Sequence, residues 1–103
     1  MANAVIEKVP AAALLFDDFD FTDDLPGDTS VTGAVTAVDS SGASASSVVG
    51  TVSVSGMSVR AVVQAGTAGE DYLLDFKATG VTTAQVIVKQ LEVRVRTKLT
   101  GAL

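Results

Sequence analysis

Apolar and polar residues alternate with a period of two along most of this chain. The clearest case is "DYLLDFKATG", which places one apolar set on a single face: Tyr72, Leu74, Phe76 and Ala78. Residues 57–63 repeat the pattern with Met57, Val59, Ala61 and Val63, and residues 87–95 with Ile87, Leu91, Val93 and Val95. A period of two is typical of strands with one face in a core.

Turn-forming residues separate these segments. "LPGD" (residues 25–28), "DSSGASASS" (39–47) and "AGTAGED" (65–71) are rich in Gly, Ser, Asp and Pro, the residues that form turns. Six or seven short strands result, and no long segment has a helical period. We therefore expect an all-β fold, an immunoglobulin-like antiparallel β-sandwich of about seven strands, with a small barrel as the alternative. Tyr72 stands where a tyrosine corner would lie, its hydroxyl bonded to backbone upstream.

The organisation along the chain predicts one domain with two flanking segments. Residues 1–13 lack turn chemistry and a clear period, so we expect an extended N-terminal arm. Residues 14–97 form the sandwich, and residues 98–103 form a C-terminal tail. An apolar arm with nothing of its own to cover usually contacts a neighbour or stays mobile.

Composition narrows the possible chemistry. The 103 residues include no Cys and no His, which removes disulfides, thiolate or imidazole catalysis and most zinc sites. The net charge of −5 argues against a nucleic-acid partner held by phosphate contacts. Because the sequence shows no catalytic side-chain combination, we expect no cofactor and no enzyme activity. No signal or membrane-spanning stretch is recognisable, so we expect synthesis in a cytosol and no membrane contact.

The stretch "LLFDDFDFTDDLPGDTS" (residues 14–30) holds six aspartates and three phenylalanines. Clustered carboxylates suit calcium, but the loop pattern D-x-[DN]-x-[DN]-G is absent. We favour a strand with Phe19 and Phe21 turned inward and Asp18 and Asp20 turned to solvent. Whether residues 17–28 bind a cation is left open.

Charge is unevenly distributed along the chain. Residues 1–51 hold eight acids and one base, whereas residues 52–103 hold four acids and six bases. The acidic opening stretch could face the basic closing segment "KQLEVRVRTK" within one chain, and such pairs would help set the strand register. Alternatively, the two could meet between subunits joined side by side in a ring. Both arrangements remain open at this point.

Three motifs occur together in this chain. The first is an Asp-aromatic-Thr segment that leads into a Leu and an Asp-Thr pair, at Asp20, Phe21, Thr22, Leu25, Asp28 and Thr29. The others are a Gly-Thr-x-Gly-x-x-Tyr turn at Gly66, Thr67, Gly69 and Tyr72, and a basic-apolar closing strand at residues 91–96. This combination resembles a family of small tailed-bacteriophage virion proteins, the fibre-to-tail or neck adaptors with an immunoglobulin-like fold. The chain departs from the family at two positions. The family usually has Trp where this chain has Phe21. The family also tends to have a β-branched apolar residue directly after the Asp-Thr pair, whereas here Ser30 stands between Thr29 and Val31.

The resemblance implies a non-enzymatic virion component of the neck or tail, assembled in the host cytoplasm and bound to other structural proteins. We expect contacts through the arm and the last strand, and self-association in a ring. The residues expected to bind partners are Val5, Ile6, Val9, Leu14, Leu15, Lys89, Arg94, Arg96 and Lys98. Two alternatives are a capsid-decorating protein and a carbohydrate- or cell-surface-binding module of the same fold.

Overall fold

Seven β-strands build the protein in the computed structural model, which describes residues 4–97. A single 3₁₀ turn, η1, precedes the fourth strand. The elements are β1 (Ala4–Lys8), β2 (Leu14–Phe16), β3 (Val31–Asp39), η1 (Ser46–Val48), β4 (Val49–Ser55), β5 (Ser58–Val63), β6 (Asp71–Gly80) and β7 (Val86–Val95).

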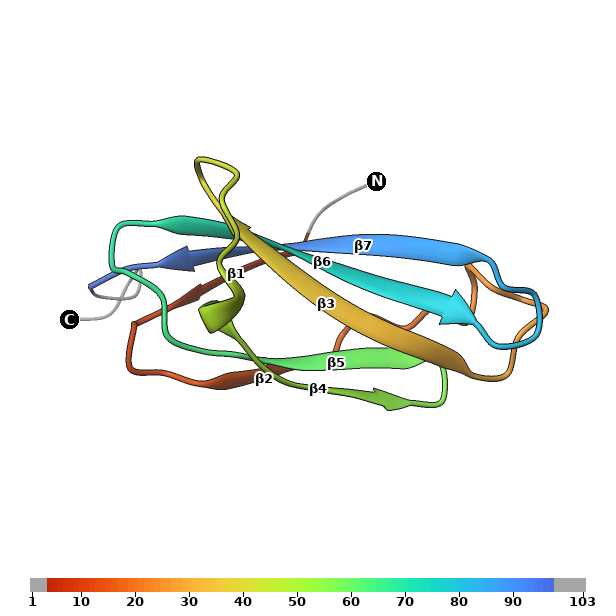
Figure 1. Ribbon diagram of the computed structural model, residues 1–103. Helices are drawn as coiled ribbons and strands as arrows, with labels where there is room; N and C mark the ends of the chain where they lie inside the picture. Colours follow the sequence, from red (N-terminus) through yellow and green to blue (C-terminus); the bar gives the residue numbers. More distant parts are fainter. Residues whose placement is uncertain (1–3, 98–103) are drawn as a thin grey trace.

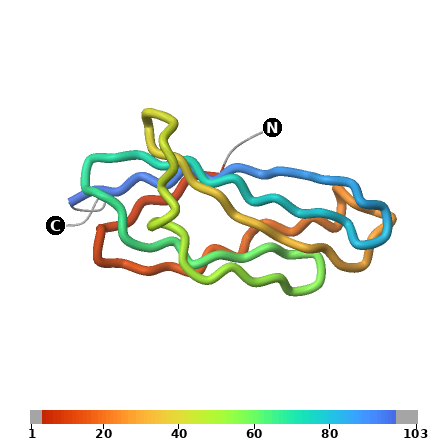
Figure 2. The backbone as a smooth tube through the Cα atoms, viewed as in Figure 1, coloured from red at the N-terminus to blue at the C-terminus, as the bar shows by residue number. Residues whose placement is uncertain are grey.

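The strands form two sheets packed face to face (Figures 1 and 2). One sheet has the order β1-β7-β6-β3 and the other the order β2-β5-β4. Neighbouring strands run antiparallel except for β1 and β7, which are parallel. The edge strands β3 and β4 contact each other across the sandwich, so β1 and β2 occupy the opposite lateral side. The all-β sandwich expected from the sequence is confirmed.

Burial follows the alternation in the central strands. The inward residues of β6, from Tyr72 to Ala78, are buried, and the outward residues between them are not. In β5 and in the second half of β7 every second residue is buried as well: Val59, Ala61, Val63, Leu91, Val93 and Val95. These small and β-branched side chains pack well on pleated sheets.

β4 departs from this rule. Val52 and Val54 lie opposite the buried Ala61 and Val59, so they are on the inward side, yet they are 36% and 39% exposed. The pairing of β4 with β5 shifts register between Val49 and Val52, and an irregularity of this kind bends an edge strand. The spacing of two between Val52 and Val54 therefore predicts a strand correctly, but it does not predict that these side chains are buried.

The N-terminal segment differs from the expected free arm. Residues 4–8 form β1, which pairs with β7 from Ala4 opposite Leu91 to Lys8 opposite Val95. The segment is thus an edge strand of this chain's own sheet, because β7 offers it unpaired backbone groups and a face for Ile6 to cover. The expected tail, residues 98–103, lies outside the described residues.

Phenylalanines from the opening stretch join the two sheets. The rings of Phe16 and Phe19 pack against the ring of Phe76 in β6, one tilted and one edge-on, with centroid distances of 5.5 Å and 5.1 Å. β2 ends at Phe16, and the chain continues beside β5 through an isolated bridge between Asp20 and Ser58. Phe21 is fully buried while Asp20 is exposed. The orientation predicted for this stretch is therefore correct, although the regular strand is shorter than expected.

Tyr72 forms the predicted tyrosine corner. Its hydroxyl accepts a hydrogen bond of 3.0 Å from the backbone N–H of Thr67, and its ring is buried. Gly66, at φ +94°, makes this approach possible, since a Cβ there would lie 2.8 Å from Val95 and 3.3 Å from the tyrosine ring. The bond ties the β5–β6 connection to the core.

Asp28 fixes the opposite end of the sandwich. This aspartate is only 7% exposed. Its carboxylate accepts hydrogen bonds from the backbone N–H groups of Thr82 and Thr83 and from the Thr83 hydroxyl. A Cβ at Gly80 would collide with this carboxylate, so glycine is required beside it. The Thr83 hydroxyl, followed by the two N–H groups, holds the pKa of Asp28 below its usual value, while burial opposes them.

Replacing Tyr72 tests the corner. Tyr72→Ala should lower the free energy of unfolding by about 3–5 kcal/mol, because a large core side chain is lost. Tyr72→Phe keeps the ring and removes one hydrogen bond, so a loss of about 1 kcal/mol is expected. Urea denaturation measures both, and equal losses for the two variants would contradict the separation of ring and hydroxyl.

Replacing Asp28 tests the clamp on the β6–β7 turn through its pH dependence. The folded-state pKa lies below the unfolded one, so the carboxylate stabilises the fold above the unfolded pKa of about 3.9, and this stabilisation is lost as pH falls through the folded value. Asp28→Asn should melt at a lower temperature than the parent at neutral pH. The gap should narrow on acidification, and a gap that stays constant would contradict the clamp.

Candidate functional site

The described residues contain no group of three or more acidic side chains placed to hold a metal ion. No helix in the same part of the chain is long and apolar enough to cross a membrane. Several aspartates instead serve their own loops. Asp39 accepts hydrogen bonds from Ser41 and from the N–H of Ala43, and the Ser41 hydroxyl first of all lowers its pKa. The pKa of Asp20 is likewise lowered, chiefly by the Thr22 hydroxyl.

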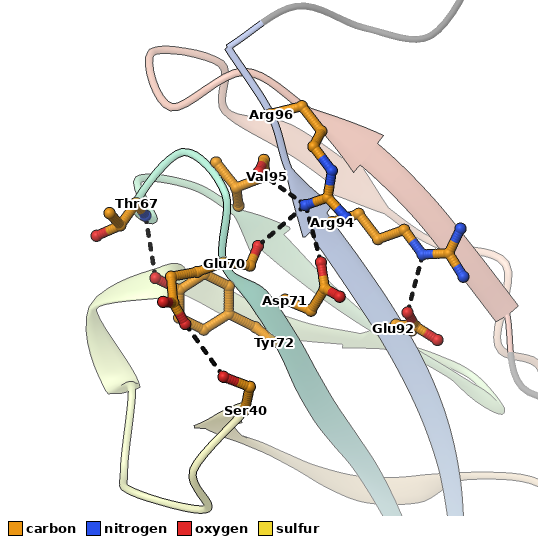
Figure 3. A network of polar contacts seen from close by, with 9 residues as sticks. All are labelled: Ser40, Thr67, Glu70, Asp71, Tyr72, Glu92, Arg94, Val95 and Arg96. Atoms are coloured by element: carbon orange, nitrogen blue, oxygen red, sulfur yellow. Dashed lines mark hydrogen bonds and ion pairs between the residues drawn. The ribbon is translucent and has the colours of Figure 1, made fainter.

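A polar network covers the end of the sheet near the tyrosine corner (Figure 3). Arg96 lies at its centre and forms an ion pair of 2.8 Å with Asp71. The same guanidinium donates to the carbonyls of Val95 and Glu70. These bonds join the end of β7 to the start of β6, so Arg96 acts as a tie within the sheet.

Arg94 extends the network across three strands. It stands between Glu7 of β1 and Asp71 of β6 in the strand register, and its guanidinium pairs with Glu92 at 2.9 Å. The Glu92 carboxylate is the main cause of a raised pKa at Arg94, with smaller contributions from Asp71 and Glu7. Cross-strand pairs of opposite charge favour this register.

Two shallow depressions adjoin the network on the outer face of the four-stranded sheet. The first is lined by Val38, Asp39, Ser40, Gly42, Asp71, Tyr72, Leu73 and Glu92, and the second by Asp39, Ser40, Ser41, Thr67, Glu70 and Tyr72. Three residues are common to both, so the depressions form one continuous feature, here named the loop groove. Its side wall is the loop of residues 39–45, which rises above the sheet in Figure 1.

Lys8 is buried although it carries a charged group. Its side chain is 1% exposed, and its ammonium donates to the carbonyls of Val9, Pro10 and Ala65. Burial lowers its pKa. The three carbonyls come from the β1–β2 and β5–β6 connections, so Lys8 holds β1 against the sandwich.

The apolar residues predicted to bind partners separate into two groups. Val5, Leu14 and Leu15 are exposed by 47%, 42% and 56%. Ile6 and Val9 are half-buried, and Ile6 packs against the core. The exposed members lie on two edge strands but point in different directions. Val5 faces outward on the four-stranded sheet, opposite Glu92, and Leu15 faces outward on the three-stranded sheet, opposite Val62.

The basic residues predicted to bind partners are engaged within the chain. Lys89 pairs with Asp24 at 2.9 Å, donates to the carbonyl of Asp20, and lies 4.9 Å from the centroid of the Phe21 ring. The predicted contact between the acidic stretch and the last strand thus exists within one chain at Lys89. Arg94 and Arg96 pair instead with acids of β6 and β7, and Lys98 lies outside the described residues.

Two features were not anticipated from the sequence. The loop groove depends on how the 39–45 loop stands against β6 and β7, which no local pattern encodes. The burial of Lys8 could have been predicted, because Lys8 follows Ala4 and Ile6 at a spacing of two and therefore lies on the same inward face of β1. A charged residue at an inward position is rarely buried without partners, and these partners became visible only in the fold.

Comparison with known proteins gives no relative: no family model, curated protein or solved structure matches this chain.

Proposed function

We propose that this chain is a non-enzymatic structural protein of a tailed-bacteriophage virion, a neck or fibre-to-tail adaptor that binds other virion proteins through its edge strands. The observation that carries the proposal is that β1 and β2 are edge strands on which Val5, Leu14 and Leu15 are each more than two-fifths exposed. An exposed edge strand with apolar side chains is a template for pairing with another chain.

The edge strands β1 and β2 are suited to pairing with a neighbouring protein. β1 pairs only with β7 and β2 only with β5, so each has a second backbone edge without a strand partner among the described residues. A neighbouring extended segment can pair with such an edge through backbone hydrogen bonds, while exposed side chains such as Leu15 provide selectivity.

The motif residues shared with the adaptor family have structural roles here, which supports the resemblance at the level of the fold. Phe21 and Leu25 are fully buried, and Asp28 holds the β6–β7 turn. Thr67 and Tyr72 form the tyrosine corner. A shared set of fold-determining positions is what a common scaffold with different partners requires.

Self-association in a ring remains part of the proposal, but we now expect apolar contacts between subunits instead of contacts between charged residues. Lys89, Arg94 and Arg96 are paired within the chain, so they have little charge to offer a neighbouring subunit. We therefore assign the contact to the edge strands β1 and β2, because association there buries the exposed Val5, Leu14 or Leu15 without breaking the ion pairs of the closing strand.

Leu15→Lys tests this assignment in the virus that encodes the chain. Leu15 faces outward opposite Val62, so the variant should fold and melt near the parent temperature, yet it should be missing from purified tailed particles by mass spectrometry. Thr32→Lys, at an exposed outward position of β3 on the other lateral side, is the matched control and should be incorporated normally.

Two outcomes would contradict the proposal. The parent chain could be absent from purified tailed particles, which would remove the virion assignment. Leu15→Lys could be incorporated as well as Thr32→Lys, which would remove the β2 edge as the contact while leaving the virion assignment in place.

A further inference from the structure

The loop groove is a shallow, open depression whose side wall is held in place by hydrogen bonds. Its wall, the 39–45 loop, is fixed by the Asp39 carboxylate, which accepts bonds from Ser41 and Ala43. Backbone bonds from Asp39 to Ala43 and from Ala45 to Ala37 hold the same loop against β3. Each of its two depressions has a volume of about 330 Å³, near the lower limit for small-ligand sites.

The floor of the groove is apolar. Val38 and Leu73 are direct neighbours on β3 and β6, and both point away from the core. They are half-buried, partly because the adjoining loop shelters them. An aliphatic chain laid over these two residues would replace water on both of them.

The rim of the groove is acidic. Asp39, Asp71 and Glu92 line the first depression and Glu70 the second, and no basic residue lines either one. The guanidiniums of Arg94 and Arg96 pair with Glu92 and Asp71 without lining the hollow. These pairs compensate the charges of Glu92 and Asp71, so the net charge of −2 on the rim rests on Asp39 and Glu70.

We propose that the loop groove binds a lysine or arginine side chain presented by an extended segment of a partner protein. These side chains combine an aliphatic stem with a cationic tip, which matches an apolar floor beside an acidic rim. The negative potential favours cationic partners and repels acidic ones. The rim carboxylates are too dispersed for a metal centre, since no three acidic groups of the described residues converge. The inference does not rest on the virion assignment.

Two-dimensional NMR of the full chain tests this binding with capped single residues. Nα-acetyl-arginine N-methylamide and Nα-acetyl-lysine N-methylamide should shift the amide signals of Gly42, Tyr72 and Leu73. Nα-acetyl-norleucine N-methylamide, the uncharged counterpart, should bind more weakly by up to about fivefold, the limit of one exposed ion pair. Raising the salt concentration should weaken the cationic probes alone.

Matched variants place the interaction in the groove. Glu92→Gln and Glu70→Gln should each weaken arginine-probe binding by up to about fivefold, and Leu73→Ser should weaken all three probes without disturbing the core. Asp75→Asn makes the same charge change at an outward position of β6 that does not line the groove and should leave binding unchanged.

Three results would overturn the proposal. Equal binding of the norleucine probe would show a purely apolar surface. Equal weakening by Asp75→Asn would show diffuse attraction to the negative chain rather than a site. Calcium chloride that produces the same shifts and displaces the arginine probe at a lower concentration would show a cation site.

Discussion

The contact of Phe76 with Phe16 and Phe19 is the interaction on which the sandwich depends. Most other core residues are valine or alanine, whose short side chains cannot bridge two sheets that pack about 10 Å apart. The three rings lie 4.9–5.5 Å apart between centroids in the tilted and edge-on arrangements that aromatic pairs favour. They join the centre of the larger sheet to the chain beside β5, so the position of the acidic stretch follows from them.

Polar bonds then fix the two ends of this aromatic centre. At one end Asp28 satisfies the N–H groups of the β6–β7 turn. At the other end Tyr72 and Lys8 satisfy backbone groups of the β5–β6 and β1–β2 connections. Each bond supplies a partner for a sheltered polar group that would otherwise destabilise the fold. Asp28 of the acidic stretch thus supports the structure of the β6–β7 turn.

The basic side chains of the closing strand form ion pairs within the domain, and this limits which surfaces can bind partners. Lys89, Arg94 and Arg96 hold strands and loops together, so the closing strand is not the free basic surface that its sequence suggests. The two surfaces proposed for partners are the edge strands β1 and β2, with their exposed apolar side chains, and the acidic loop groove. They differ in chemistry, so the two proposals involve different neighbours.

The sequence by itself determined the class of fold and the inward faces of β5, β6 and β7, because a period of two needs only adjacent residues to be expressed. It also determined the tyrosine corner, since the turn and Tyr72 lie within a few residues of each other. Only the tertiary structure decided that residues 4–8 pair with β7, that Lys8 is buried, that Val52 and Val54 stay exposed, and that the 39–45 loop encloses a groove. Each of these outcomes depends on segments far apart in the chain, whose meeting is set by the packing of the two sheets and leaves no local pattern.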